Sequence, residues 1–334
     1  MSRTQIIAEI GVNHNGSLII AKKLIKKAAE AGAHYVKFQV YNTEDLIVRK
    51  LKKAEYQKKN DSFATQDEML KKYQLSQSNF LELFNFSKKL KIGFMSSAFD
   101  LSSIDFLCDV LKNKIIKIPS SEITNYPYLV HIAKKKKKLI LSTGMANLKE
   151  IRNAIFTISK FGTPKKNITL FHCVSEYPTS DAKANILSII KLRKEFNLNI
   201  GYSDHTQGIE ASKVAVSIGA TFIEKHLTLD TKMKGPDHFA SINPSSFKKM
   251  INGIKRVEKL LGKAAVKPTS EEIKNSKLVR KKIVALRNIK KGEKFNNSNI
   301  TTKRAYKGIS GMNWNNAIGK KAKKNYLKDE VIKL

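Results

Sequence analysis

The chain has 334 residues, which is too long for one ordinary domain and too short for two large ones. Its composition is that of a globular protein, and it contains no run of 18 apolar residues for a membrane span. The formal net charge is +35, but only eight of the 63 basic residues are arginine, which disfavours recognition of nucleic-acid bases. We interpret the lysines as a solvated surface that attracts anionic substrates, and expect neither a nucleic-acid nor a membrane partner.

The N-terminal residues MSRTQIIAEIGVNHNG enter a strand-like run directly, without the charged and apolar regions of a signal peptide. Two cysteines, Cys108 and Cys173, are too few for a disulfide framework. Together these features predict a reducing, cytoplasmic location.

Short β-branched or apolar runs alternate with helix-like segments, as is typical of parallel strands joined by helical crossovers. The expected strands are Gln5–Glu9, Tyr35–Gln39, Gly93–Ser97, Ile115–Ile118, Leu139–Ser142, Ile168–His172, Asn199–Ser203 and Thr221–His226. The expected helices include Leu18–Ala31, Leu101–Leu111, Leu148–Phe161 and Gly208–Ile218. Eight strands with helices between them predict an α/β fold, a closed (β/α)8 TIM barrel. The long connection from Glu44 to Ser78 is expected to cover the barrel mouth.

Near Leu261 the alternation stops, which predicts a change of domain. We expect residues 1–262 to form a catalytic barrel, residues 263–276 a linker and residues 277–334 a small second domain. About 58 residues bury little core, so we expect this domain to dock on another surface.

Polar residues close nearly every expected strand, and barrel enzymes carry their chemistry at that end. These residues are Glu9, Lys37 and Gln39, Ser96 and Ser97, Lys117, Ser142, His172, Ser203 and His205, and Glu224 and His226. So many in the same position are hard to explain by packing alone.

His205 and His226 end two successive strands, so their imidazoles are expected to lie close together. One interpretation is a shared divalent cation, Mn²⁺ or Mg²⁺, with open positions for substrate oxygens or water. The other is a pair of hydrogen-bonded structural histidines.

Lys37 and Lys117 end two further strands, and a lysine inside a barrel mouth needs an anionic partner. A phosphate or carboxylate fits, with hydroxyl groups from Ser97, Ser120 and Ser203. Two alternatives remain: one lysine forms a Schiff base with a carbonyl substrate, or the lysines are exposed after short strands.

Three carboxylates, Glu9, Glu122 and Asp237, are expected near strand ends or mouth loops, where they would bind hydroxyl groups or move protons. For Glu122 the alternative is an acid that stabilises a helix N-terminus.

Several segments in matching order resemble the sialic acid synthase family over nearly the whole chain. They are Ala8–Gly16, Lys37–Gln39, Lys117–Glu122, Leu141–Met145, Tyr202–Thr206 and Gly235–His238, while Lys282–Leu334 resembles that family's antifreeze-like (SAF, β-clip) domain. Three departures from the family pattern occur, at Ala98, at Ser121 and at Ala305-Tyr306.

The resemblance implies condensation of phosphoenolpyruvate with an N-acetylmannosamine-type sugar, in which phosphate is lost by C–O cleavage. It places phosphoenolpyruvate against Lys37, Ser97, Lys117, Ser120, Ser175 and Ser203. It places the sugar against Glu9, Gln39, Tyr177, Asp237 and Arg304. It implies a metal on His205 and His226, and catalytic roles for these histidines, Glu9 and Glu122. It also implies a domain-swapped homodimer.

Two segments, Lys53–Gln57 and Glu122–Pro127, are more similar to N,N′-diacetyllegionaminate synthases than to N-acetylneuraminate synthases. The favoured sugar is therefore 2,4-diacetamido-2,4,6-trideoxymannose, with N-acetylmannosamine as the alternative. A Schiff-base aldolase and a basic polyanion-binding protein remain as more distant hypotheses.

Overall fold

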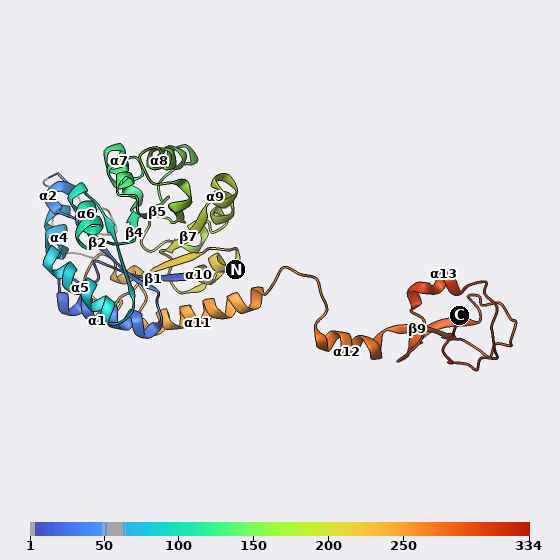
Figure 1. Cartoon of the computed structure of the whole chain (residues 1–334). Helices are drawn as coiled ribbons and strands as arrows, with labels where there is room; N and C mark the ends of the chain where they lie inside the picture. The colour runs from blue at the N-terminus through green and yellow to red at the C-terminus, as the bar shows by residue number, and fades with distance from the viewer. Residues whose placement is uncertain (1–3, 49–50, 52–62, 64) are drawn as a thin grey trace. The chain divides into compact units, whose positions relative to one another are not determined.

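The computed structural model describes residues 4–48, 51, 63 and 65–334. They form two compact units, Met1–Gly262 and Lys263–Leu334 (Figure 1). None of the helices in this described part of the chain is both long and apolar enough to cross a membrane.

In the described part of the first unit, strands β1 to β8 run parallel and close into a barrel in sequence order. Their bounds are β1 Gln5–Gly11, β2 Tyr35–Val40, β3 Gly93–Ala98, β4 Ile115–Ile118, β5 Lys138–Ser142, β6 Ile168–His172, β7 Asn199–Asp204 and β8 Phe222–His226. The predicted TIM barrel is confirmed, and each expected strand is present within two residues of its expected ends.

Helices cover the outside of the barrel (Figure 1). The α-helices are α1 Leu18–Ala31, α2 Thr43–Leu46, α4 Gln66–Tyr73, α5 Gln77–Lys89, α6 Leu101–Asp105, α7 Tyr126–Lys134, α8 Leu148–Lys160, α9 Ser188–Phe196, α10 Glu210–Ser217 and α11 Pro244–Leu261. Short turns of other types are η1 Phe106–Val110, η2 Ser120–Glu122, η3 Lys165–Asn167, η4 Asp181–Lys183 and η5 His238–Ala240. The helix expected over Leu101–Leu111 is therefore α6 followed by a π-turn, η1.

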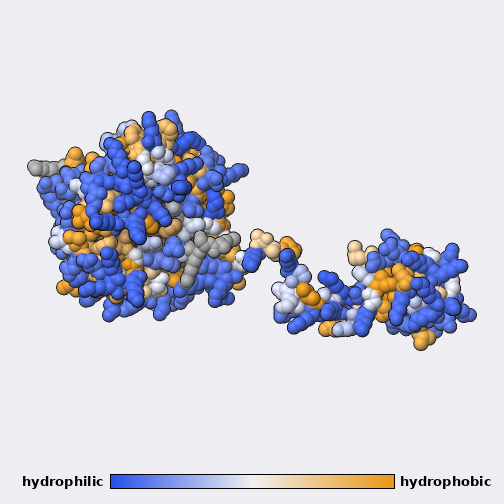
Figure 2. All heavy atoms as spheres, in the orientation of Figure 1, coloured by the Kyte–Doolittle hydropathy of each residue, from blue (hydrophilic) through white to orange (hydrophobic). Residues whose placement is uncertain are grey.

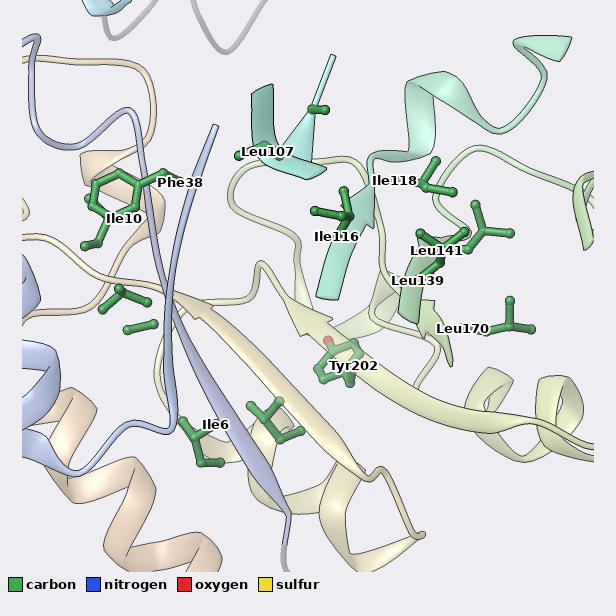
Figure 3. Packing of buried hydrophobic residues seen from close by; sticks show 14 of the residues in the cluster. Ile6, Ile10, Phe38, Leu107, Ile116, Ile118, Leu139, Leu141, Leu170 and Tyr202 are labelled. Carbon is green, nitrogen blue, oxygen red and sulfur yellow. The ribbon is translucent and has the colours of Figure 1, made fainter. Parts of the chain in front are cut away.

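The two faces of each strand have different partners because successive side chains point to opposite sides. Outward residues such as Ile6, Phe38 and Leu141 pack in one large apolar cluster beneath the helices (Figure 3). The next residue along often points inward, and Ile7, Met95, Ile140 and Phe171 fill the lower barrel. This apolar floor leaves the upper inward positions for polar chemistry.

The second unit has its own small core around an antiparallel pair, β9 Lys281–Ala285 and β10 Ile300–Arg304. Further elements are α12 Ser270–Val279, η6 Gly311–Asn313 and α13 Trp314–Ala317. The core residues are Ile283, Ala285, Ile289, Phe295, Ile300, Ala317, Ala322, Tyr326 and Ile332. Hydrophilic residues cover most of the face of each unit seen in Figure 2. The segment expected as a linker, residues 263–276, includes the first part of α12.

Candidate active site

A cavity of about 630 Å³ opens at the carboxyl ends of the barrel strands. It brings together most of the site residues predicted from the sequence: Glu9, Lys37, Gln39, Ser97, Lys117, Ser120, Glu122, Ser175, Tyr177, Ser203, His205 and His226. A larger hollow of about 970 Å³ in the second unit, whose lining is described in full, has no acidic or histidine side chain. The convergence of titratable groups therefore favours the barrel mouth as the active site.

Two ion pairs lie directly above the apolar floor of the barrel. Lys117 Nζ lies 2.5 Å from Glu224 Oε1, and Lys37 Nζ lies 2.7 Å from Glu9 Oε2. Lys37 Nζ is also 3.7 Å from Glu224 Oε2, so the four side chains form one buried cluster. Both lysines predicted to hold an anion are thus inside the mouth, and neither is a surface residue.

Glu224, which the sequence indicated only as a polar strand ending, is a central member of this cluster and lines the cavity. Its carboxylate accepts hydrogen bonds from Lys117 and from Ser203 Oγ, the latter at 2.8 Å. The sequence did indicate that Glu224 faces the cavity, because it lies two residues before His226 and residues two apart on a strand share a face.

The two carboxylates of the cluster have opposite pKa shifts. Burial raises the pKa of Glu9 to about 7, against the attraction of Lys37. Burial also acts to raise the pKa of Glu224, but Lys117 and Lys37 outweigh it and lower that pKa to about 2. Glu224 is therefore the fixed negative charge between the two ammonium groups.

Small polar groups form a cradle beside the lysines. Lys37 Nζ donates to Ser97 Oγ at 3.2 Å, and the hydroxyl groups of Ser120 and Ser175 lie 3.3 Å apart. A Cβ added to Gly144 would lie 2.5 Å from Ser175 Oγ and 3.3 Å from Ser120 Oγ. The bare backbone at Gly144 keeps this cradle open for a small anion.

His205 and His226 face one another across the same cavity, with ring centroids 5.7 Å apart. His205 Nδ1 donates to the Val174 carbonyl at 2.6 Å, so Nε2 carries a lone pair. His226 Nδ1 is buried and has no hydrogen-bond partner among the described residues; its nearest acid is Asp237, at 3.9 Å.

Both histidine rings are in the neutral protonation state that binding a divalent cation requires. Burial lowers the pKa of His205 to about 4 and the pKa of His226 well below its usual value, so both rings are neutral at physiological pH. No group of three or more His, Cys, Asp or Glu residues suited to a metal occurs in the described residues. A cation here would have two imidazole ligands and open positions for oxygen ligands.

The residues predicted for the sugar are only partly together. Tyr177 packs on His205, with ring centroids 4.1 Å apart, and Gln39 lines the cavity. Glu122, the predicted proton-transfer residue, accepts hydrogen bonds from Ser121 Oγ and Asn125 Nδ2 at the cavity wall.

Two predicted sugar ligands lie outside the cavity lining. Asp237 is buried beside His226, and burial raises its pKa to about 6. Arg304 is exposed at the end of β10, in the second unit.

The connection expected to cover the mouth contributes to it where it is described. Leu46, Ile47, Gln66 and Leu70 line the cavity. Lys53–Gln57, on which part of the sugar prediction rests, lies outside the described residues.

A TIM barrel with an anion cradle, paired lysines and two neutral histidines at its mouth defines a barrel enzyme acting on an anionic substrate. The chain belongs to the NeuB family, whose model matches residues 24–266, and residues 280–334 match the SAF domain. The predicted resemblance is confirmed, and the chain is an enzyme of the sialic acid synthase type.

Curated relatives and a solved structure support the same class. The chain is 49% identical, over all of both chains, to the N,N′-diacetyllegionaminic acid synthase of Campylobacter jejuni. It is 43% identical to the Legionella pneumophila synthase of the same name, covering 96% of this chain and 90% of that one. The crystal structure of a Leptospira borgpetersenii N-acetylneuraminic acid synthetase superposes with a TM-score of 0.73 at 34% identity, covering 82% of this chain and 90% of that one.

Proposed function

We propose that this enzyme condenses phosphoenolpyruvate with 2,4-diacetamido-2,4,6-trideoxymannose to give N,N′-diacetyllegionaminate and phosphate. The observation that carries the reaction type is the cluster of buried lysines beside a hydroxyl cradle and two neutral histidines. The choice of sugar is supported by the 49% identity to a relative of that name over both full lengths.

The floor of the cavity suits a small anion with two acidic groups. Lys37 and Lys117 supply charge, while Ser97 and Ser120 supply hydroxyl groups around them. Ser203 lines the same floor, and its hydroxyl donates to Glu224 until substrate binds. Because Glu224 balances these lysines inside the protein, they stay ordered before phosphoenolpyruvate arrives. Ser175 completes the cradle opposite Gly144.

The reaction forms one bond between the substrates and breaks one bond to phosphate. C3 of phosphoenolpyruvate attacks the sugar aldehyde carbon, and the aldehyde oxygen takes up a proton to become a hydroxyl group. Water adds to C2, and one of its protons balances the proton taken up by the aldehyde oxygen. The C2–O bond to phosphate then breaks as the C2 carbonyl forms, and the second proton of the water leaves with the phosphate. Glu122, held by Ser121 and Asn125, is proposed to carry a proton in these steps.

The two histidines are the proposed holders of Mn²⁺ or Mg²⁺. The cation would supply Lewis-acid polarisation of the sugar aldehyde. His205 contributes Nε2, since its Nδ1 is bonded to Val174, and His226 contributes a neutral ring. Tyr177 packs against both rings and limits their rotation.

The sugar preference is tested by comparing the two sugars in separate kinetic assays. We expect a higher kcat/KM for 2,4-diacetamido-2,4,6-trideoxymannose than for N-acetylmannosamine, because the apolar lining residues Leu46, Ile47 and Leu70 suit a C6 methyl group and a C4 acetamido methyl group better than two hydroxyl groups. The measurement is phosphate release at equal phosphoenolpyruvate with each sugar varied. Equal or better kcat/KM with N-acetylmannosamine would make the chain an N-acetylneuraminate synthase, which is the alternative.

A Schiff-base aldolase of the same fold is the more distant alternative. Lys37 is paired with Glu9 and Glu224, which raise its pKa against burial, keep its amine protonated and disfavour its attack on a carbonyl. Burial lowers the pKa of Lys117, but its Nζ is engaged by Glu224 Oε1 at 2.5 Å, so this amine is not free to attack. Borohydride treatment with pyruvate would label an aldolase covalently and leave the synthase unlabelled.

A domain-swapped homodimer in which Arg304 acts in the partner's barrel is also proposed. The small core of the second unit makes docking on a partner favourable, and Arg304 is exposed there. Two inactive variants, Arg304→Ala and His205→Ala, should then complement each other after co-refolding. Random mixing should make about half of the dimers mixed, and each mixed dimer has one intact site of its two. About one quarter of wild-type activity should therefore return. Mixed dimers that form but stay inactive would rule out action in trans.

A cytoplasmic location remains our proposal for this enzyme. Cys108 and Cys173 are both free and buried, which is compatible with a reducing compartment. Fractionation of the producing cells with antibody detection would test it.

A further inference from the structure

Asp204 and Lys225 directly precede the two cavity histidines and form an ion pair that the proposed reaction does not use. Asp204 Oδ2 lies 3.1 Å from Lys225 Nζ, and both side chains are 0% exposed. The two residues are partners in the register of β7 and β8. Because side chains alternate along a strand, this pair lies on the outer face of the barrel while His205 and His226 point inward.

The ion pair also holds the chain that follows His205. Lys225 Nζ donates to the Thr206 carbonyl at 2.5 Å. The Asp204 carboxylate accepts from Thr206 N at 2.9 Å, from Thr206 Oγ1 at 2.7 Å and from Ser212 Oγ at 2.6 Å. The residues on both sides of His205 are thereby tied to the residue before His226.

Stability alone is a poor explanation for this arrangement. A buried ion pair loses solvation that its attraction barely recovers, and apolar residues of similar volume are often as stable. The outward neighbours Tyr202 and Ile223 are apolar and pack in the main core. An apolar pair would lack directional contacts, whereas these side-chain hydrogen bonds hold the residues around His205 in one orientation relative to Lys225.

We propose that Asp204 and Lys225 are positioning residues that hold His205 and His226 at the separation needed to bind one divalent cation. The inference rests on the proposed metal site and adds residues to it that do not touch the cation. Residues that orient metal ligands commonly change metal affinity by roughly 10- to 100-fold when replaced.

The test measures Mn²⁺ binding to metal-free full-length protein by calorimetric titration, with the melting temperature recorded for each variant. Lys225→Met removes the tie to Thr206 but leaves Asp204 its three donors, so we expect it to fold. The double variant Asp204→Asn/Lys225→Met removes both charges of this pair and provides a second folded test. Ser212→Ala removes a donor from the same carboxylate without touching the cross-strand tie. Leu24→Ala, which removes a buried side chain of α1 from the main core, is the control for general destabilisation.

We expect Lys225→Met and the double variant each to weaken Mn²⁺ binding by roughly 10-fold or more. The Ser212→Ala and Leu24→Ala proteins should bind Mn²⁺ with an affinity within about 3-fold of wild type, even where their melting temperature falls. Both variants keep the contacts of Lys225 with Asp204 and with the Thr206 carbonyl. Wild-type affinity in both Lys225 variants, or a loss no larger than that of Leu24→Ala, would overturn the positioning role alone. If the wild-type protein binds no Mn²⁺, the metal site and this role are both wrong.

Discussion

Replacing His205 or His226 by alanine should lower kcat by at least about 100-fold while the barrel stays folded. Each imidazole is one of two protein ligands available to the proposed cation, and Lewis-acid activation contributes several kcal/mol to such reactions. A loss of about 1.4 kcal/mol corresponds to tenfold in rate. The measurement is kcat at saturating substrates with added Mn²⁺, together with circular dichroism and melting temperature.

The matched control for these variants is His172→Gln. His172 also ends a barrel strand, but its Nε2 is bonded to the Ala184 carbonyl and its ring stacks on Tyr202, outside the cavity. This variant should keep its rate and its response to metal.

Chelator treatment should inactivate wild type reversibly, with recovery on Mn²⁺ or Mg²⁺. Full activity in metal-free protein would show that the reaction needs no divalent cation on these histidines.

Replacing Lys37 or Lys117 by methionine should weaken the use of phosphoenolpyruvate much more than the use of the sugar. A lost hydrogen bond to a charged group costs about 1.5–3 kcal/mol, or roughly 10- to 150-fold in kcat/KM. Both Nζ groups lie in the floor of the cavity, so the loss should appear with phosphoenolpyruvate as the varied substrate. Lys138→Met, at the exposed start of β5, should leave kcat/KM unchanged for phosphoenolpyruvate and for the sugar.

Lys117→Met also leaves the buried Glu224 with Lys37, 3.7 Å away, as its remaining cationic partner, which lowers stability. The double variant Lys117→Met/Glu224→Gln removes the carboxylate charge that has lost its nearer partner. It should recover much of the melting temperature without recovering phosphoenolpyruvate binding. If the double variant regains wild-type kcat/KM, Lys117 serves only to neutralise Glu224 and does not bind substrate.

The sequence predicted the barrel and most of its mouth because both depend on short-range patterns. Strands such as Ile115–Ile118 and Ile168–His172 were predicted at their observed bounds, since β-branched runs end where polar residues begin. The placement of Lys37, Lys117, His205 and His226 followed from one geometric fact: parallel strands in a barrel all end at the same face.

Features that depend on distant partners were not predictable in this way. Glu224 pairs with Lys117, 107 residues earlier in the chain, and no local pattern indicates which acid faces which lysine. The Asp204–Lys225 pair is charged yet wholly buried, contrary to the expectation that charged residues are exposed. The π-turn at Phe106–Val110 has no distinctive composition within an otherwise helical pattern.

The proposed enzyme consumes phosphoenolpyruvate by forming a carbon–carbon bond and cleaving the C2–O bond. The most direct measurement supplies phosphoenolpyruvate with ¹⁸O at the oxygen that bridges C2 and phosphorus, plus the 2,4-diacetamido sugar. Phosphorus NMR then shows whether the released phosphate carries the label. We predict labelled phosphate in equal amount to the new nine-carbon acid. Unlabelled phosphate, or an acid formed from pyruvate without phosphate release, would contradict the account.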